Sequence, residues 1–165
     1  EEVTYTAGVR NVTFRDIFLE KPRVGFSVHF DVGKYSRSYY PGALIPKQEQ
    51  LVFDNVRVLH DGGNDFLSIG TPMDVLTLSH CSFRNNTIRF HGNEAMRDYL
   101  ETRLNLLGCV FSNPGEHALV TNSVAGKAVD VRTTGCVALA GSFKAKVVEG
   151  GGRIAVRSDL PGLAG

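Results

Sequence analysis

Four polar side chains in this sequence of 165 residues have the types and spacing of a ligand-binding row. His29 and Asp31 alternate with the apolar residues of one short segment, and Arg89 and His91 alternate with those of another. Because alternate residues of a strand point to the same side, each pair is expected on an outward face. Imidazole, carboxylate and guanidinium groups spaced by the distance between strands suit sugar hydroxyls and carboxylates. We predict a substrate-binding face here, on which neighbouring third strands also leave Ser27, Ser68, Thr121 and Asn122 outward. The alternative is an ordinary solvated sheet surface.

A loop predicted over 31–49 supplies further binding chemistry. It carries Arg37, Tyr39 and Tyr40. Tyrosine rings can stack on sugar faces, and a guanidinium can hold a carboxylate with two parallel hydrogen bonds. Seven Lys and Arg residues against three acids between positions 10 and 47 favour an acidic polysaccharide or oligosaccharide as partner. The alternative is a loop that buries its own tyrosine rings.

Composition limits the class of protein. Hydrophobic residues make up 42%, charged residues 21%, and the net charge is +1. A disordered chain and a strongly basic nucleic-acid binder are therefore not expected. Apolar runs fall far short of the roughly 20 residues that span a bilayer, so no membrane partner is expected. We predict no cofactor and no metal, and a secreted, periplasmic or cell-surface location.

A repeat runs through the chain and predicts the fold. Five segments carry apolar residues two and four positions before a pivot residue and one and three positions after it. The segments are VTFRDIFL (12–19), LVFDNVRV (51–58), LTLSHCSF (76–83), LNLLGCVF (104–111) and the weaker VRTTGCVA (131–138). The alternation changes phase by one residue at each pivot, so two short strands must meet at a tight corner there.

The pivots share a tolerance for a left-handed backbone. They are Asp16, Asn55, His80, Gly108 and Gly135. These are glycine and the residue types most enriched at positive φ. A third apolar strand follows most pairs, for example Leu67-x-Ile69. Three strands per repeat predict an all-β protein, a right-handed parallel β-helix (solenoid) of about five to six rungs with three strands per rung.

Two other structures are compared with this prediction. A β-sandwich or jelly roll would need hairpin turns between antiparallel strands, and only Asp61-Gly62 has the sequence of one. A short helix is conceivable over 93–103, which opens with Asn and contains good helix formers.

The predicted organisation is one domain. Residues 1–165 form a single β-helix, 31–49 are an inserted loop and 150–165 an irregular C-terminal tail. Because the ends of a β-helix expose open strand edges, we expect the chain to be the C-terminal portion of a longer β-helix. The alternative partner is a second chain that covers the open end.

The three cysteines are predicted to be core residues. Cys81, Cys109 and Cys136 occupy the position after the pivot, where Ile17 and Val56 stand in the earlier repeats. Small buried hydrophobes stacked in one ladder are therefore expected. A zinc site would need closer ligand spacing.

With the repeats laid out, the chain resembles the pectin-lyase-like β-helix superfamily. The segments GVRNVTFRDI (8–17), Tyr39-Tyr40-Pro41 and LVFDNV (51–56) resemble late rungs of the polygalacturonase family, glycoside hydrolase family 28, and 76–90 resembles pectate lyase rungs. The resemblance covers roughly 8–125. It implies the β-helix fold and a polysaccharide glycosidase or lyase acting on a pectin-like acidic glycan.

The catalytic motifs of that family are not matched. The Asn-Thr-Asp element is present only as Asn86-Thr87 followed by Ile88, and the Asp-Asp pair only as Asn64-Asp65. Catalytic residues are therefore unassigned. Two alternatives stay open: a non-catalytic glycan-binding or adhesion β-helix, and a structural segment that packs on another chain.

Overall fold

The computed structural model describes residues 8–29, 47–59, 64–92, 100–112, 116–139, 144–160 and 163. Four of the predicted binding residues, Asp31, Arg37, Tyr39 and Tyr40, lie outside the described residues.

The described residues form fourteen β-strands and no helix. Within this part of the chain there is accordingly no helix long and apolar enough to span a membrane. The strands are β1 (Val12–Leu19), β2 (Val24–His29), β3 (Gln48–Val58), β4 (Asp65–Gly70), β5 (Met73–Ser79), β6 (Ser82–Phe83), β7 (Thr87–Phe90), β8 (Glu101–Leu107), β9 (Val110–Ser112), β10 (Glu116–Asn122), β11 (Ala128–Thr134), β12 (Val137–Leu139), β13 (Lys144–Glu149) and β14 (Arg153–Arg157).

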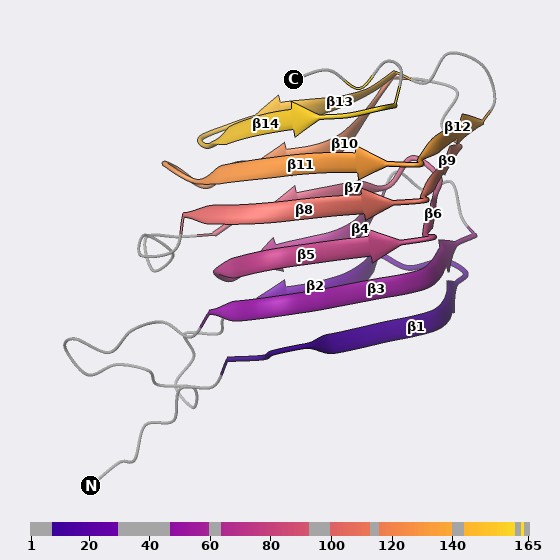
Figure 1. Cartoon of the computed structure of the whole chain (residues 1–165), viewed down its shortest axis with the longest axis horizontal. Helices are drawn as coiled ribbons and strands as arrows, with labels where there is room; N and C mark the ends of the chain where they lie inside the picture. Colours follow the sequence, from indigo (N-terminus) through magenta and orange to yellow (C-terminus); the bar gives the residue numbers. More distant parts are fainter. Residues whose placement is uncertain are drawn as a thin grey trace, which may run out of the picture.

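The strands make two sheets in which every described pairing is parallel. One sheet has nine strands, in the order β12-β9-β6-β3-β5-β8-β11-β14 with β1 beside β3. The other has five, in the order β13-β10-β7-β4-β2. Strands from successive repeats stack from β1 at one end to β14 at the other (Figure 1). This confirms the all-β, parallel prediction.

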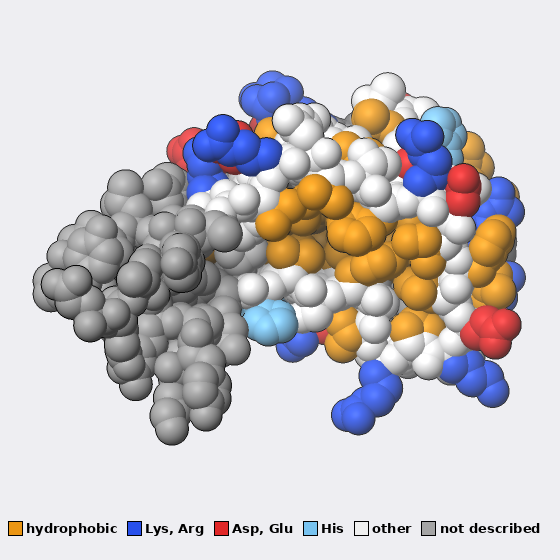
Figure 2. All heavy atoms as spheres, turned by 90° about the horizontal axis from the view of Figure 1, so that it is seen from below, with side chains coloured by type: hydrophobic (Ala, Val, Ile, Leu, Met, Phe, Trp, Pro, Cys, Tyr) orange, Lys and Arg blue, Asp and Glu red, His pale blue; other side chains and the backbone are white. Residues whose placement is uncertain are grey.

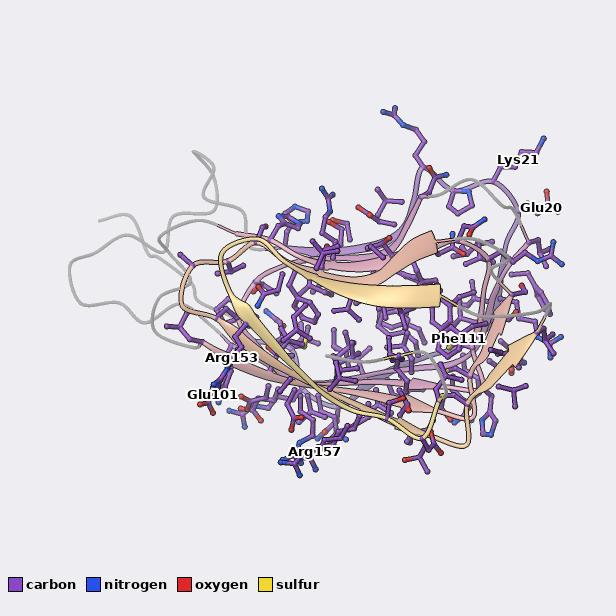
Figure 3. All side chains as sticks on the ribbon, turned by 90° about the horizontal axis from the view of Figure 1, so that it is seen from above. Glu20, Lys21, Glu101, Phe111, Arg153 and Arg157 are labelled. Atoms are coloured by element: carbon purple, nitrogen blue, oxygen red, sulfur yellow. The ribbon has the colours of Figure 1, made fainter. Side chains whose placement is uncertain are left out.

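The core lies between the two sheets. Seen from above the stack, side chains of both sheets fill the space between them (Figure 3). Apolar residues before the pivots, such as Phe53 and Leu78, are fully buried, and so are Ile69 and Phe90 of the five-stranded sheet. The period-2 pattern places these side chains inward because each strand has one buried face.

All five pivots have the predicted backbone. Their φ angles are 57° at Asp16, 52° at Asn55, 53° at His80, 59° at Gly108 and 64° at Gly135. Where β1 and β3 bend, Asn55 Nδ2 donates a hydrogen bond to Asp16 Oδ1 at 2.8 Å. Residues that tolerate positive φ therefore form the corner. Between Asp16 and Asn55, a side-chain hydrogen bond also links two neighbouring repeats at this corner.

The residues after the pivots form the predicted inward ladder. Ile17 pairs with Val56, Cys81 and Cys109 are buried, and Cys136 is half-buried. Each thiol lies near a backbone carbonyl of an earlier repeat, at 3.3 Å in all three cases. All three cysteines are free, as their role as small core residues requires.

Three segments differ from the prediction. Glu101–Leu107 is strand β8, so the short helix considered over 93–103 does not extend to its C-terminal end; pairing with both β5 and β11 outweighs the helix propensity. Strand β14 lies within the expected tail 150–165, where Ile154 is buried beside β11. Strand β3 begins at Gln48, inside the expected loop 31–49.

One end of the stack is apolar. Seen from below, hydrophobic side chains gather on this face (Figure 2). They belong to the first repeat and pack against the core while remaining partly exposed: Val12, Phe14, Ile17, Leu19, Phe26 and Val28. We call this surface the first-repeat face.

The pivot glycines allow a matched test of the corner. Alanine at Gly108 or Gly135 should lower the free energy of unfolding by about 1–2 kcal/mol, because both adopt positive φ. Gly108→Ala should cost more, since its new Cβ would lie 3.1 Å from His80 Cδ2, whereas nothing lies within 4 Å at Gly135. Urea denaturation of both variants measures the difference. If both variants lose no more unfolding free energy than a substitution at an exposed strand position, Gly108 and Gly135 are not corner residues that require positive φ.

Candidate functional site

The five-stranded sheet carries a polar cluster on its outer face. Strand register places Ser27 of β2 beside Ser68 of β4, and Ser68 beside Arg89 of β7. Two residues further along, His29 pairs with Gly70. We call Ser27, His29, Asp65, Ser68, Arg89 and His91 the outer-face cluster.

The Ser68 hydroxyl lies at the centre of this cluster. Its Oγ is 2.7 Å from His91 Nε2 and 3.5 Å from Arg89 Nη2. The same Arg89 nitrogen forms an ion pair with Asp65 Oδ2 at 2.8 Å. A carboxylate, a guanidinium, a hydroxyl and an imidazole are thus connected in one network across two neighbouring strands.

Two histidines border the network on either side of Gly70. His29 is exposed, and its Nδ1 is 3.2 Å from Ser27 Oγ. A Cβ added at Gly70 would lie 2.8 Å from His91 Cε1 and 3.3 Å from His29 Cβ. Glycine at this position is therefore what lets the two side chains approach one another.

The electrostatics of the cluster keep His91 neutral. Burial lowers the pKa of His91 below the ordinary value of histidine, and the nearby charge of Arg89 lowers it further, against a smaller opposing effect of Asp65. At neutral pH its Nε2 can therefore accept a hydrogen bond from Ser68 or donate one, according to the tautomer. The charged group available to a ligand is Arg89, whose side chain is 48% exposed.

The predicted binding residues that the structure describes do come together. His29, Arg89 and His91 lie on one face, with Thr121 in register beside Arg89. The expectation that Asn122 also points outward is wrong: it lies two residues after the inward Val120, it pairs with the buried Phe90, and it is itself buried. Its amide donates hydrogen bonds to the backbone carbonyls of Lys127 and Arg153.

Alternation already placed Ser68 on the outward face between Ser27 and Arg89, but the sequence did not predict its contacts with His91 and Arg89. It also did not predict the ion pair of Asp65 with Arg89. The strand register shifts between Asp65 and Leu67, so alternation alone does not identify the neighbours of Asp65.

The cluster has the chemistry of a hydrogen-bonding site. Among the described residues, no group of three or more His, Cys, Asp or Glu side chains is placed to hold a metal ion. Guanidinium, hydroxyl and imidazole groups instead offer donors and acceptors for a polar organic ligand. No protein-family model, curated protein or solved structure matches this chain.

Proposed function

We propose that this chain is a right-handed parallel β-helix that binds an acidic polysaccharide on its outer-face cluster. Support for the β-helix comes from the order of the strands: each repeat sends one strand to the five-stranded sheet and one bent pair to the nine-stranded sheet. Every neighbour is parallel and one repeat away, and each bend has a residue at positive φ. Three strands per rung account for all of these features.

The resemblance of 8–125 to the pectin-lyase-like superfamily supports the same proposal. It favours a pectin-like glycan as ligand, and a secreted, periplasmic or cell-surface location follows from a polysaccharide of that kind. Binding on the flat outer face of a parallel sheet also agrees with the polar row His29, Arg89 and His91.

One observation carries the proposal: the network in which Ser68 lies between His91 and Arg89. A guanidinium has five N–H donors, so Arg89 can keep its ion pair with Asp65 and still bind a carboxylate of the glycan. The exposed imidazole of His29 and the hydroxyl of Ser27 can bind sugar hydroxyls beside it.

Cleavage of the glycan, by a glycosidase or lyase reaction, is the second proposal. Inverting hydrolysis uses two carboxyl groups about 6.5–9.5 Å apart, one acting as acid and one as base. In the outer-face cluster Asp65 supplies the carboxylate, and Arg89 holds it in an ion pair. Binding is therefore the function that the geometry supports best. Reducing-sugar release and the absorbance of unsaturated products on pectic substrates would separate hydrolase, lyase and binding protein.

Removing Arg89 should abolish most of the binding. In Arg89→Ala, with or without Tyr39→Ala, we expect at least a tenfold loss of affinity for oligogalacturonate, because a charge-assisted hydrogen bond contributes about 1.5–3 kcal/mol. Stability should change by less than about 1 kcal/mol, since the ion pair is partly exposed. Calorimetric titration and thermal unfolding measure the two quantities.

The control for this experiment is Arg57→Ala. Arg57 is exposed on β3 of the other sheet, and its guanidinium hydrogen bonds to Asn55 Oδ1. This variant removes the same charge and should keep full affinity. Equal affinity of the Arg89 and Arg57 variants would place the binding site elsewhere.

The first-repeat face supports a further alternative, an architectural role. Its partly exposed apolar side chains border the edge of β1 that pairs with no described strand. A further rung of a longer chain, or a second chain, would bury them and pair that edge.

A further inference from the structure

A groove of about 700 Å³ crosses the outer face of the nine-stranded sheet, on the opposite side of the core from the outer-face cluster. It extends over β3, β5, β8, β11 and β14, which are consecutive neighbours in that sheet. Three of the residues that border it, Glu101, Arg153 and Arg157, project outward from this sheet in Figure 3.

The groove exists because short side chains lie between long ones. Ala155 follows Asp130 and Arg103 in one row across the strands. Ala128 lies between Glu101 and Arg153 in the next row. The methyl groups form a low floor, and the charged side chains form the walls.

Most of the acids in the walls are already neutralised by cations. Arg10 pairs with Glu49 at 3.0 Å, Lys47 with Asp74 at 2.8 Å, and Arg132 with Asp130 at 2.7 Å. None of these three cations is itself in the groove lining.

The arginines in the walls lack an acidic partner among the described residues. The side chains of Arg103, Arg153 and Arg157 are exposed and form no ion pair with another described residue. Against these three guanidiniums the lining has one carboxylate without such a partner, Glu101. The groove therefore attracts anions, and more strongly at low ionic strength.

The spacing of the arginines fits an extended ligand. Arg103 and Arg157 lie on strands separated by β11 and are offset by two residues in register, so their backbones are about 12 Å apart at the usual strand and residue spacings. Arg153 and Arg157 are four residues apart on β14, which is about 13 Å. A chain with repeated negative charges can reach all three, whereas one small anion cannot.

We propose that this groove is a second binding site, for a carboxylate-bearing oligosaccharide. Its walls combine guanidiniums, which bind carboxylates, with carboxylates and amides, which accept hydrogen bonds from sugar hydroxyls. A single-stranded nucleic acid fits less well, because the described lining contains no aromatic side chain for base stacking. This proposal rests on the proposed function in one respect: both assume that the ligand is an acidic glycan.

The test is a calorimetric titration of the whole chain with oligogalacturonate at low salt. In the Arg103→Ala/Arg157→Ala variant, one class of binding sites should weaken at least tenfold, while the class that depends on Arg89 persists. The matched control, Arg57→Ala/Arg84→Ala, removes two exposed arginines outside the groove lining and should keep both classes. A neutral oligosaccharide of the same length should not bind in the groove.

The outcomes separate this inference from the proposed function. Binding that depends on Arg103 and Arg157 but not on Arg89 would support the groove and contradict the outer-face cluster. Unchanged binding in the groove variant, with circular dichroism that shows a native fold, would overturn the groove site. Tighter groove binding of a single-stranded oligonucleotide than of oligogalacturonate would overturn the assignment of its ligand. Should the alanine variant fail to fold, Arg103→Gln/Arg157→Gln removes the same charges and is judged by the same criteria.

Discussion

Replacing Phe83 with alanine is expected to lower the free energy of unfolding by about 3–5 kcal/mol. The side chain is 2% exposed. Its ring stacks on Phe111 with centroids 5.4 Å apart and lies edge-on to Phe66 at 4.7 Å. Truncation removes these contacts and leaves a cavity between the sheets, which parallel strands paired on both sides can close only in part.

Phe18→Ala is the control for this measurement. Phe18 lies on β1 but is 59% exposed, so its loss should change the unfolding free energy by no more than about 0.5 kcal/mol. The two variants are compared by urea denaturation. If the dependence of the unfolding free energy on urea concentration is unchanged, the difference between the variants comes from packing in the native state. Similar losses in both variants would mean that the Phe83 ring is not in the core.

The sequence was sufficient to predict the bent strands because their signals are local. Alternation with period 2 identifies the inward residues, and a phase change at a residue such as Asn55 or His80 identifies the corner. Positive φ restricts the residue types at that corner so strongly that five pivots could be aligned without any relative. The cysteine ladder follows from the same alignment.

Features that depend on irregular register could not be predicted. The ion pair between Asp65 and Arg89 involves strands whose register shifts. The groove on the nine-stranded sheet requires knowing which residues of five non-consecutive strands are neighbours, and that β14 pairs with β11 at all.

Lys127 is the least expected residue in the interior. It is 1% exposed, its Nζ donates a hydrogen bond to Thr102 Oγ1 at 2.8 Å, and it lies 5.7 Å from the centre of the Phe90 ring. No acidic side chain is among these contacts. Burial lowers the pKa of Lys127 to about 8, because an ammonium group loses its hydration when it is buried.

This lowered pKa predicts a stability that increases at alkaline pH. Between about pH 8 and the ordinary lysine pKa of 10.5, the unfolded chain binds more protons than the folded chain at this site, so the free energy of unfolding rises with pH. The rise due to Lys127 should approach about 3 kcal/mol. Below pH 8 both states are protonated and this stabilisation is absent.

Comparison of Lys127→Met with the natural chain isolates this effect. Methionine keeps the length of the side chain but cannot titrate, so the variant should lack the part of the rise that Lys127 supplies, while other groups titrate equally in both proteins. Lys21→Met, at an exposed position, should behave like the natural chain. The measurement is urea denaturation at several pH values from 7 to 10.5. Parallel pH curves for the natural chain and Lys127→Met would show that the ammonium group of Lys127 is hydrated in the folded protein.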